Sequence, residues 1–364
     1  MKVGILTHYN VNNQGAQLQM YATYNKLKEM GHTPVVLTYP KNFDFVDEGL
    51  KKRNIVTISS IPYFLKEYLF KKGLRLTWFN VKKYIKNRKF RENEFVFERY
   101  ALANTDLAIV GADEVFSLEN GLNMMMFGHC VGTKRIVSYA PSCGQTNVDI
   151  YKKYNAWELV KSGLNKFSNL SARDENTFDV ITKATGKNDV ELVIDPVLLY
   201  DFSKIHQKVK LPKKDYILVY SYDKNMNKPE EITAIKEYAK NNNLKIVSAG
   251  TYHKWCDYNF SCNGLEWIEY FRNAKEVITD TFHGTILATI TKKPMGVYVR
   301  EGLNKNKLEY LLKQLKIEER RLNKVDYGTI NKVMRKEINF YKIDKNLDEL
   351  RKNSNSYFMK CLGE

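Results

Sequence analysis

The segment from Val277 to Thr285 carries the most informative chemistry of the sequence, because a histidine follows a short apolar run. The order Val-Ile-Thr-Asp-Thr-Phe-His-Gly-Thr predicts a strand that ends near Thr279 and a helix that begins at His283. A histidine at such a junction can bond a ligand's phosphate or act as a general acid. A structural role fits equally, with the histidine packed and Asp280 capping the helix.

Several cations also follow predicted strands and could bind an anionic ligand. Arg173 ends a strand in the first half of the chain, and an arginine can grip a carboxylate or phosphate through two parallel hydrogen bonds. Its alternative role is an ion pair with the acidic residues that follow it. Arg300, Lys305 and Lys307 lie just beyond the last predicted strand. They either add positive charge to a ligand site or are solvated.

Polar residues follow two further strands. Asn10 to Gln17 form a polar turn that opens a helix, where backbone N–H groups can hold an anion and amide side chains can bond hydroxyls. Helix capping by the asparagines is the alternative. Asp113 and Glu114 follow a third strand, and they either bind sugar hydroxyls or begin a helix.

The elements that would position these side chains alternate between strand and helix. In the first half we expect strands at 3–9, 33–39, 107–111, 135–140, 170–173 and 190–194, and helices at 15–31, 149–166 and 175–185. In the second half we expect strands at 216–222, 245–249, 276–279 and 296–300, and helices at 229–241, 265–273 and 283–291. This alternation predicts parallel sheets covered on both faces, with ligands at the carboxyl ends of the strands.

A polar stretch at 203–214 divides the chain into two α/β halves that face each other across a cleft. The predicted N-terminal domain spans 1–202 and carries a basic, aromatic-rich insert at about 41–105. The C-terminal domain spans 203–330. A helical tail, 331–364, is expected to pack back on the N-terminal domain.

Composition excludes several classes of protein. The chain has 364 residues, 43% of them hydrophobic and 27% charged, which argues against global disorder and fits two domains. No apolar run approaches the length of a spanning helix, and the first apolar run is too short for a signal peptide. Five cysteines without a CxxC pair indicate reduced thiols in a cytoplasmic protein. The spacing of His and Cys predicts no metal site.

The net charge of +17 is concentrated in one window. Between residues 51 and 100 there are fourteen basic residues, four acidic residues and eleven aromatics. Three interpretations fit this window. It forms a solvated helical hairpin with its aromatics packed inward, it binds nucleic acid, or it attaches the protein to an anionic membrane. No nucleic-acid module is recognisable, so we do not expect nucleic acid as a partner.

Taken together, the segments resemble the polysaccharide pyruvyl transferase family. The likeness covers most of the chain outside the insert and the tail after Asn304. It rests on the order and spacing of these motifs: Gly4–Thr7, Asn13–Gln19, Val110–Val115, Ser138–Ser142, Leu170–Asp174, Val193–Leu199 and Val277–Thr285.

The resemblance implies a GT-B-like fold of two Rossmann-like domains. It also implies metal-independent transfer of pyruvate from phosphoenolpyruvate to two sugar hydroxyls as a ketal, without a further cofactor. The acceptor would be a surface polysaccharide or a lipid-linked glycan. His283 would be catalytic, with the donor held by Arg173, Arg300, Lys305, Thr281 and Gly284, and the acceptor by Asn13, Gln14, Gly15, Gln17, Asp113 and Glu114. Attachment to the inner face of the membrane through the insert would suit such an acceptor.

One departure from the family pattern keeps alternatives open. Several members have Arg-Leu immediately before the motif histidine, where this chain has Thr281 and Phe282. The missing arginine removes one anchor for an anionic donor. The alternative function is therefore a GT-B glycosyltransferase that uses a sugar nucleotide. An alternative from another class is a non-catalytic protein that binds glycans or nucleic acid.

Overall fold

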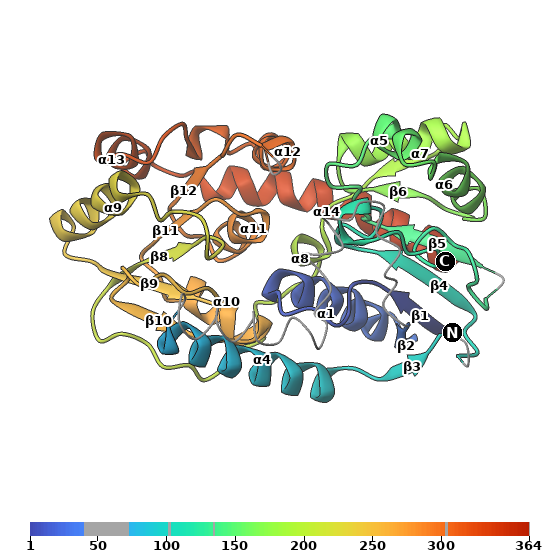
Figure 1. The fold of residues 1–364 in the computed structure, drawn as a ribbon, viewed down its shortest axis with the longest axis horizontal. Coiled ribbons are helices and arrows are strands. Elements are labelled where there is room, and N and C mark those ends of the chain that lie inside the picture. The colour runs from blue at the N-terminus through green and yellow to red at the C-terminus, as the bar shows by residue number, and fades with distance from the viewer. Residues whose placement is uncertain (40–72, 101–102, 134, 303–304, 364) are drawn as a thin grey trace.

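Two parallel sheets, each covered by helices, make up the protein (Figure 1). The computed structural model describes residues 1–39, 73–100, 103–133, 135–302 and 305–363. The first sheet has the strand order β3-β2-β1-β4-β5. Its strands are β1 (Lys2–Leu6), β2 (Thr33–Thr38), β3 (Phe97–Arg99), β4 (Leu107–Gly111) and β5 (Ile136–Tyr139).

The second sheet repeats this arrangement with the order β10-β9-β8-β11-β12-β13. Its strands are β8 (Tyr216–Tyr220), β9 (Lys245–Ala249), β10 (Tyr258–Phe260), β11 (Glu276–Thr279), β12 (Met295–Tyr298) and β13 (Arg321–Leu322). In both sheets the first strand in sequence lies centrally, and the order reverses beside it. Open sheets of this kind bind ligands at that switch point. The predicted α/β class is confirmed, whereas the boundary at residue 203 stays a prediction.

Helices connect the strands and cover the sheets (Figure 1). Beside the first sheet lie α1 (Gln14–Glu29), α4 (Leu74–Glu94), α5 (Val148–Lys153), α6 (Trp157–Leu164), α7 (Glu175–Thr185) and α8 (Pro196–Leu199). Beside the second lie α9 (Pro229–Asn241), α10 (Gly264–Arg272), α11 (Phe282–Ile290), α12 (Lys305–Leu315) and α13 (Tyr327–Met334). Short 3-10 helices span Leu118–Asn120 and Glu318–Arg320, and the chain ends in α14 (Phe340–Leu362).

Three details differ from the expected elements. The helix expected at 149–166 breaks into α5 and α6, because Asn155 adopts a left-handed φ of 54° between them. The strands expected at 170–173 and 190–194 shorten to β6 (Ser171–Ala172) and β7 (Glu191–Leu192), which form a sheet of their own. The edge strands β3, β10 and β13 went unpredicted, since two or three residues at a sheet edge leave no alternating pattern.

Only part of the basic insert is described, so the helical hairpin expected there stays a prediction. The described part begins at residue 73. It is one long helix, α4, followed by β3, which joins the first sheet. Phe79 and Phe90 of α4 are buried, but Trp78 and Tyr84 are exposed. Residues 40–72 lie outside the described part of the chain. The insert therefore contributes both an edge strand and the crossover helix that leads to it.

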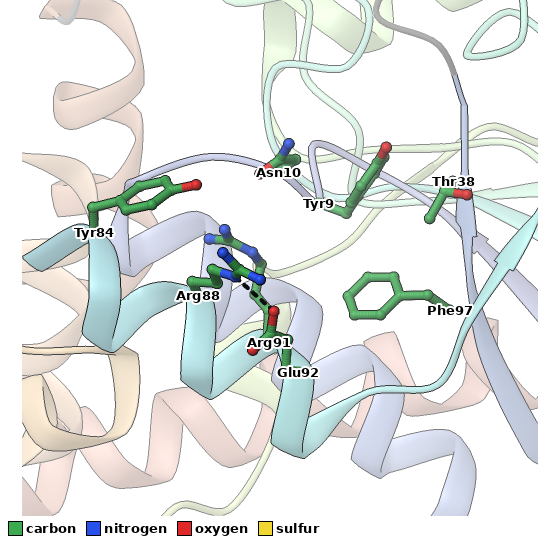
Figure 2. Close-up of a pocket in the computed structure, with 8 residues that line it drawn as sticks. All are labelled: Tyr9, Asn10, Thr38, Tyr84, Arg88, Arg91, Glu92 and Phe97. Carbon is green, nitrogen blue, oxygen red and sulfur yellow. Dashed lines mark hydrogen bonds and ion pairs between the residues drawn. The ribbon is translucent and has the colours of Figure 1, made fainter.

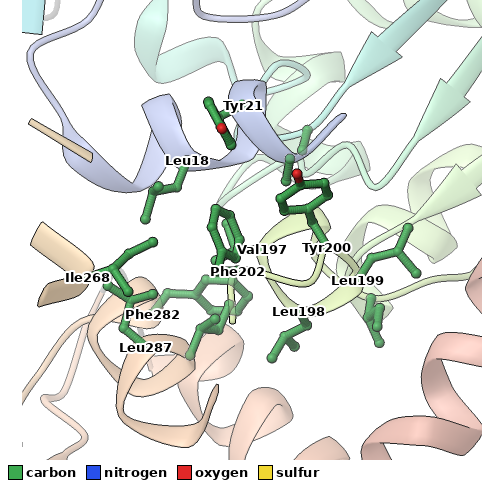
Figure 3. Close-up of a cluster of buried hydrophobic side chains, with 14 of the residues drawn as sticks. Leu18, Tyr21, Val197, Leu198, Leu199, Tyr200, Phe202, Ile268, Phe282 and Leu287 are labelled. Atoms are coloured by element: carbon green, nitrogen blue, oxygen red, sulfur yellow. The ribbon is translucent and has the colours of Figure 1, made fainter. Parts of the chain in front are cut away.

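A shared apolar core holds the two halves together (Figure 3). The short helix α8 lies between α1 of the first half and α11 of the second. Leu18 of α1, Val197 of α8 and Leu287 of α11 all belong to one buried cluster. Because this core spans both halves, it fixes the relative positions of the elements that form the site between them.

The C-terminal helix α14 also links the halves. Near its start, Asn346 donates to the carbonyl of Gln314 in α12 at 2.8 Å. Near its end, the hydroxyl of Tyr357 donates to the carbonyl of Ser138 on β5, also at 2.8 Å. The last turns of α14 therefore pack on the first sheet (Figure 1).

We predict that Tyr357→Phe lowers the free energy of unfolding by about 1 kcal/mol, because it removes one buried hydrogen bond. The carbonyl of Ser138 still accepts from the hydroxyl of Ser171, so no acceptor is left unpaired. Urea unfolding measures the change. Tyr341→Phe on the same helix is the matched control, since Tyr341 is 80% exposed. Equal stability of both variants would contradict this account of the α14 contact.

Candidate functional site

A buried carboxylate, Asp195, joins the two halves of the candidate site. It caps α8 by accepting from the backbone N–H of Val197 at 2.9 Å. Its Oδ2 also accepts from Arg173 Nη1 at 3.0 Å and from Gln19 Nε2 at 2.6 Å. The Nε2 of His283 lies 3.7 Å from the same oxygen. Since His283 comes from α11, a single oxygen connects the first half with the second.

His283 is positioned by the junction of β11 and α11. It is the second residue of α11, as the sequence motif predicts to within one residue. Its imidazole packs against Gly15 at the start of α1, where any Cβ would overlap its Nδ1. Among the described residues its Nε2 has no hydrogen-bonding partner. The imidazole therefore lies between Gly15 and the carboxylate of Asp195, which can balance its charge when it exchanges a proton with a ligand.

The surroundings of Asp195 keep it ionised. Burial alone would raise the pKa of its carboxyl group, but His283, Arg173 and the N–H of Val197 lower it to about 2. The guanidinium of Arg173 also lies over the ring of Phe282, 4.7 Å from the centroid. At neutral pH, Asp195 is therefore a carboxylate that can balance the charge of a protonated imidazole.

Asp113 brings a second, half-buried carboxylate to this cluster. It follows β4 and adopts a left-handed φ of 71°, which aspartate tolerates better than most residues. Burial raises the pKa of Asp113, yet the nearby His8, Arg173 and His283 together hold it below its ordinary value. The predicted strand-end residues Asp113, Arg173 and His283 thus lie within electrostatic reach of one another.

Glu114 makes another contact between the halves. Its carboxylate pairs with the ammonium of Lys307 on α12 at 2.7 Å, and both side chains are largely buried. Its backbone carbonyl contacts Nε2 of His8 at 3.3 Å. Glu114 is therefore already paired, and Lys307 supplies the cation that the sequence indicated only as one of three candidates.

The polar turn before α1 supports both interpretations that the sequence left open. Asn13 caps α1, because its Oδ1 accepts from the N–H groups of Gly15 and Ala16. Gln14 donates to the carbonyl of Cys262 at 2.9 Å, across the cleft. Both residues also line a cavity of about 380 Å³ whose described walls are Asn12, Asn13, Gln14, Lys83, Tyr220, Tyr222, Asp223, Lys224, Asn225 and Thr251.

Three further candidates hold backbone in place. Gln17 donates to the carbonyl of Val11 at 3.5 Å, within the polar turn. Thr281 caps α11 by accepting from the N–H of Gly284 at 3.0 Å. A Cβ at Gly284 would overlap the hydroxyl of Thr279, so the helix start needs a glycine. Thr281 and Gly284 shape the start of α11, whereas Gln17 also keeps a buried Oε1 that has no hydrogen-bonding partner among the described residues.

Arg300 and Lys305 do not join the cluster around Arg173. Arg300 pairs with Asp280 at 2.6 Å and Glu231 at 3.1 Å, because these carboxylates lie beside it at the end of the second sheet. Lys305 pairs with Glu301, four residues earlier in the chain, at 3.0 Å. The expectation that both would converge with Arg173 on one anion is therefore not met by this arrangement.

Sequence reasoning missed Asp195, Gln19 and His8 as site residues. In the sequence Asp195 stands out only as part of the motif Val193–Leu199. Its position after an apolar run, like that of Arg173, was the available signal. Gln19 belongs to the motif Asn13–Gln19, but a buried glutamine inside a helix resembles any polar helical residue, so its role in the site is not visible in the sequence.

The described part of the chain has neither a cluster of potential metal ligands nor a membrane-spanning helix. Across residues 1–39 and 73–363 with their short gaps, no group of three His, Cys, Asp or Glu side chains could hold a metal ion. None of the described helices is long and apolar enough to cross a membrane.

Comparison with known proteins places the chain in a sequence family. The family model described as polysaccharide pyruvyl transferase matches residues 13–300, which includes Asp113, Arg173, Asp195 and His283. No curated protein sequence matches the chain.

The solved structures that resemble the chain share its architecture. UDP-GlcNAc 2-epimerase from Neisseria meningitidis, bound to UDP-GlcNAc, has a TM-score of 0.52, 12% identity and full coverage of both chains. The S. aureus MnaA–UDP structure has a TM-score of 0.51 at 12% identity and covers 100% of this chain and 98% of that one. A spinosyn rhamnosyltransferase has a TM-score of 0.50 at 10% identity with full coverage of both chains. At such identities the likeness establishes the fold, which is GT-B.

We predict that Asp195→Asn lowers the free energy of unfolding by about 3 kcal/mol at pH 7, since it leaves Arg173 buried without its carboxylate. The difference from wild type should shrink in acid. The lowered pKa means that the carboxylate stabilises the fold above its ordinary value near 4 and loses this effect as pH falls through about 2.

Urea unfolding at several pH values measures both effects. Asp179→Asn is the matched control, because Asp179 pairs with Lys183 on an exposed helix surface. Its removal should cost no more than about 0.5 kcal/mol. Equal losses in the two variants would contradict the role assigned to Asp195.

Proposed function

The chain belongs to the polysaccharide pyruvyl transferase family, and from that premise we propose that it moves pyruvate from phosphoenolpyruvate onto a sugar as a ketal. The fold and the family make it a transferase rather than a passive binding protein. The donor and the acceptor are the parts that we propose. The observation that carries them is the cluster of Asp195, Arg173 and His283 across the two halves.

Donor binding needs cations near the reacting carbon, because phosphoenolpyruvate carries a carboxylate and a phosphate. Arg173 supplies one such charge beside His283, and Lys307 supplies another where α12 meets the first half. Both are paired with carboxylates in this structure. We therefore propose that the donor binds by sharing these cations with Asp195 and Glu114, rather than through Arg300 or Lys305.

The chemistry consists of one addition and one displacement at the same carbon. The methylene carbon of the donor takes up a proton, and one sugar hydroxyl adds to the neighbouring carbon. A second hydroxyl then displaces inorganic phosphate from that carbon. Of the two hydroxyl protons, one balances the new methyl group and the other leaves on phosphate. We assign the proton transfers to His283, whose charge the carboxylate of Asp195 would balance.

The acceptor would occupy the cavity of about 380 Å³ next to the start of α1. Its walls combine amides, phenols and a threonine hydroxyl with the charged groups of Lys83, Asp223 and Lys224, and all of these can hydrogen-bond the hydroxyl groups of a sugar. Asn13 and Gln14 belong to this wall, as the family resemblance implies. We propose that a sugar of a polysaccharide or lipid-linked glycan is presented here.

A sugar nucleotide as donor is the competing function. The Neisseria meningitidis epimerase and the S. aureus protein are described as bound to UDP-GlcNAc and to UDP, and both have the same fold. The missing arginine before His283 also leaves one anion anchor fewer for phosphoenolpyruvate. The two functions differ in the ligand that the free enzyme binds, so ligand binding separates them.

We predict that phosphoenolpyruvate raises the Tm of the protein and that UDP-GlcNAc does not. A ligand at 100 times its Kd stabilises the folded state by about 2.7 kcal/mol. Arg173→Lys should reduce the shift, because lysine keeps the charge but loses the paired nitrogens. Differential scanning fluorimetry measures it. A shift with UDP-GlcNAc alone would favour the glycosyltransferase.

We also predict that Gly15→Ala reduces pyruvyl transfer by about 100-fold while the protein remains folded. The new Cβ would displace the imidazole of His283, and a displacement of about 1 Å can cost that much. Release of phosphate from phosphoenolpyruvate with acceptor present measures turnover.

Gly328→Ala provides the matched control for this substitution. Gly328 is also the second residue of a helix, and a Cβ there meets no atom closer than 3.4 Å. That variant should keep full activity. If Gly15→Ala also kept full activity, the imidazole would not be needed where the structure places it.

A further inference from the structure

The outward face of α4 is apolar. Leu74, Trp78, Val81 and Ile85 follow one another at intervals of four, three and four residues, so they form one stripe along the helix. Their exposed fractions are 73%, 60%, 41% and 46%. Isolated exposed apolar residues are ordinary, but a continuous stripe on one helix indicates an interaction surface.

The opposite face of α4 fixes the helix to both halves of the protein. The ammonium of Lys86 pairs with Glu266 of α10 at 2.9 Å. Farther along, Asn87 contacts Asn12 and Arg91 donates to the carbonyl of Val11. The helix is therefore held in place, and its apolar stripe is presented outward.

Cations flank one side of the stripe. A groove of about 500 Å³ lies between α4 and the second half, and its described cations are Arg75, Lys82, Lys86, Lys208 and Lys210. Its one described acidic residue, Glu266, is already paired with Lys86. Within the described chain the other four cations have no carboxylate partner. Lys82 lies over the ring of Trp78, 5.1 Å from its centroid, so the groove and the stripe are contiguous.

The other side of the stripe is also basic. Figure 2 shows Arg88 and Arg91 projecting from α4 between Tyr84 and Tyr9, in a second cavity of about 270 Å³. Arg88 pairs with Glu92 at 2.7 Å, one turn along the helix. Over its whole length α4 carries seven basic residues and two acidic ones, and both acids lie in its last turn.

We propose that α4 docks the protein on an anionic membrane. The stripe of Leu74, Trp78, Val81 and Ile85 would enter the boundary between headgroups and acyl chains, where tryptophan is favoured. Arg75, Lys82, Lys208 and Lys210 would bind lipid phosphates at the groove. Charge complementarity selects this occupant, because each cation near an anionic surface contributes about 1 kcal/mol.

Docking through α4 does not require pyruvyl transfer. It bears on the proposed function only because it would set where the acceptor cavity lies relative to the membrane. Lys83 of the same helix lines the cleft cavity proposed for the acceptor. Attachment through α4 would hold that cavity near the membrane surface, where a lipid-linked sugar is presented.

Vesicle co-sedimentation tests the proposal with the full-length protein. We expect wild type to bind phosphatidylcholine vesicles that contain phosphatidylglycerol, and to bind pure phosphatidylcholine weakly. The double variant Trp78→Ser and Ile85→Ser should lose most binding, as should the triple variant Lys82→Gln, Lys208→Gln and Lys210→Gln. The controls are Tyr341→Ser on α14, and Lys236→Gln with Lys240→Gln on the exposed surface of α9.

A spectroscopic reading identifies the face that binds. Binding should shift the tryptophan emission of wild type to the blue. Trp78→Phe should still sediment with vesicles but lose most of the shift, because Trp267 is buried and the half-buried Trp157 and Trp255 lie outside α4.

Three results would overturn the proposal: equal sedimentation of the α4 variants and wild type, an unchanged emission shift in Trp78→Phe, or no vesicle binding by wild type. If UDP bound in the groove without vesicle binding, a soluble diphosphate would be the ligand instead. The Tm shift with phosphoenolpyruvate, measured on the same variants, shows that they are folded. If phosphoenolpyruvate did not shift the Tm of wild type, that result would contradict the proposed donor but not the membrane docking.

Discussion

The carboxylate of Asp195 is the interaction on which the rest of the site depends. It neutralises the buried guanidinium of Arg173, accepts from Gln19 and faces His283 from the other half. A buried ion pair of this kind adds little net stability, but removing one partner is costly. The arrangement therefore fixes geometry: the arginine and the histidine remain at one oxygen. The apolar core around α8 packs against both halves and so keeps the elements that carry this contact in place.

Pairing with a carboxylate also distinguishes two groups of cations in this chain, which has a net charge of +17. Around Asp195 and Glu114 the cations are matched by carboxylates, Arg173 by Asp195 and Lys307 by Glu114. On α4, several cations have no such partner in the described chain and lie beside exposed apolar side chains. Paired cations suit a small anionic substrate, whereas unpaired ones beside an apolar stripe suit a surface.

The sequence sufficed for the fold and for half of the site. Alternating strands and helices predict two parallel sheets, and the strand-end rule finds Arg173, Asp113 and His283. It cannot tell which cations lie beside His283, because Arg300 pairs with Asp280 and Glu231, which are far from it in the sequence, whereas Arg173 reaches Asp195. Nor can it find Gly15 as the partner of His283, since that contact joins residues far apart in the sequence. The outward stripe of α4 was hidden for the same reason.

The most direct test of the central claim follows the reacting carbon itself. Phosphoenolpyruvate labelled with ¹³C at its second carbon would be incubated with the protein and membrane-extracted glycans, and observed by ¹³C and ³¹P NMR. The account predicts that the label moves to a ketal carbon while an equal amount of inorganic phosphate appears, and that neither change occurs with His283→Ala. Unchanged phosphoenolpyruvate, together with release of UDP from UDP-GlcNAc, would contradict it.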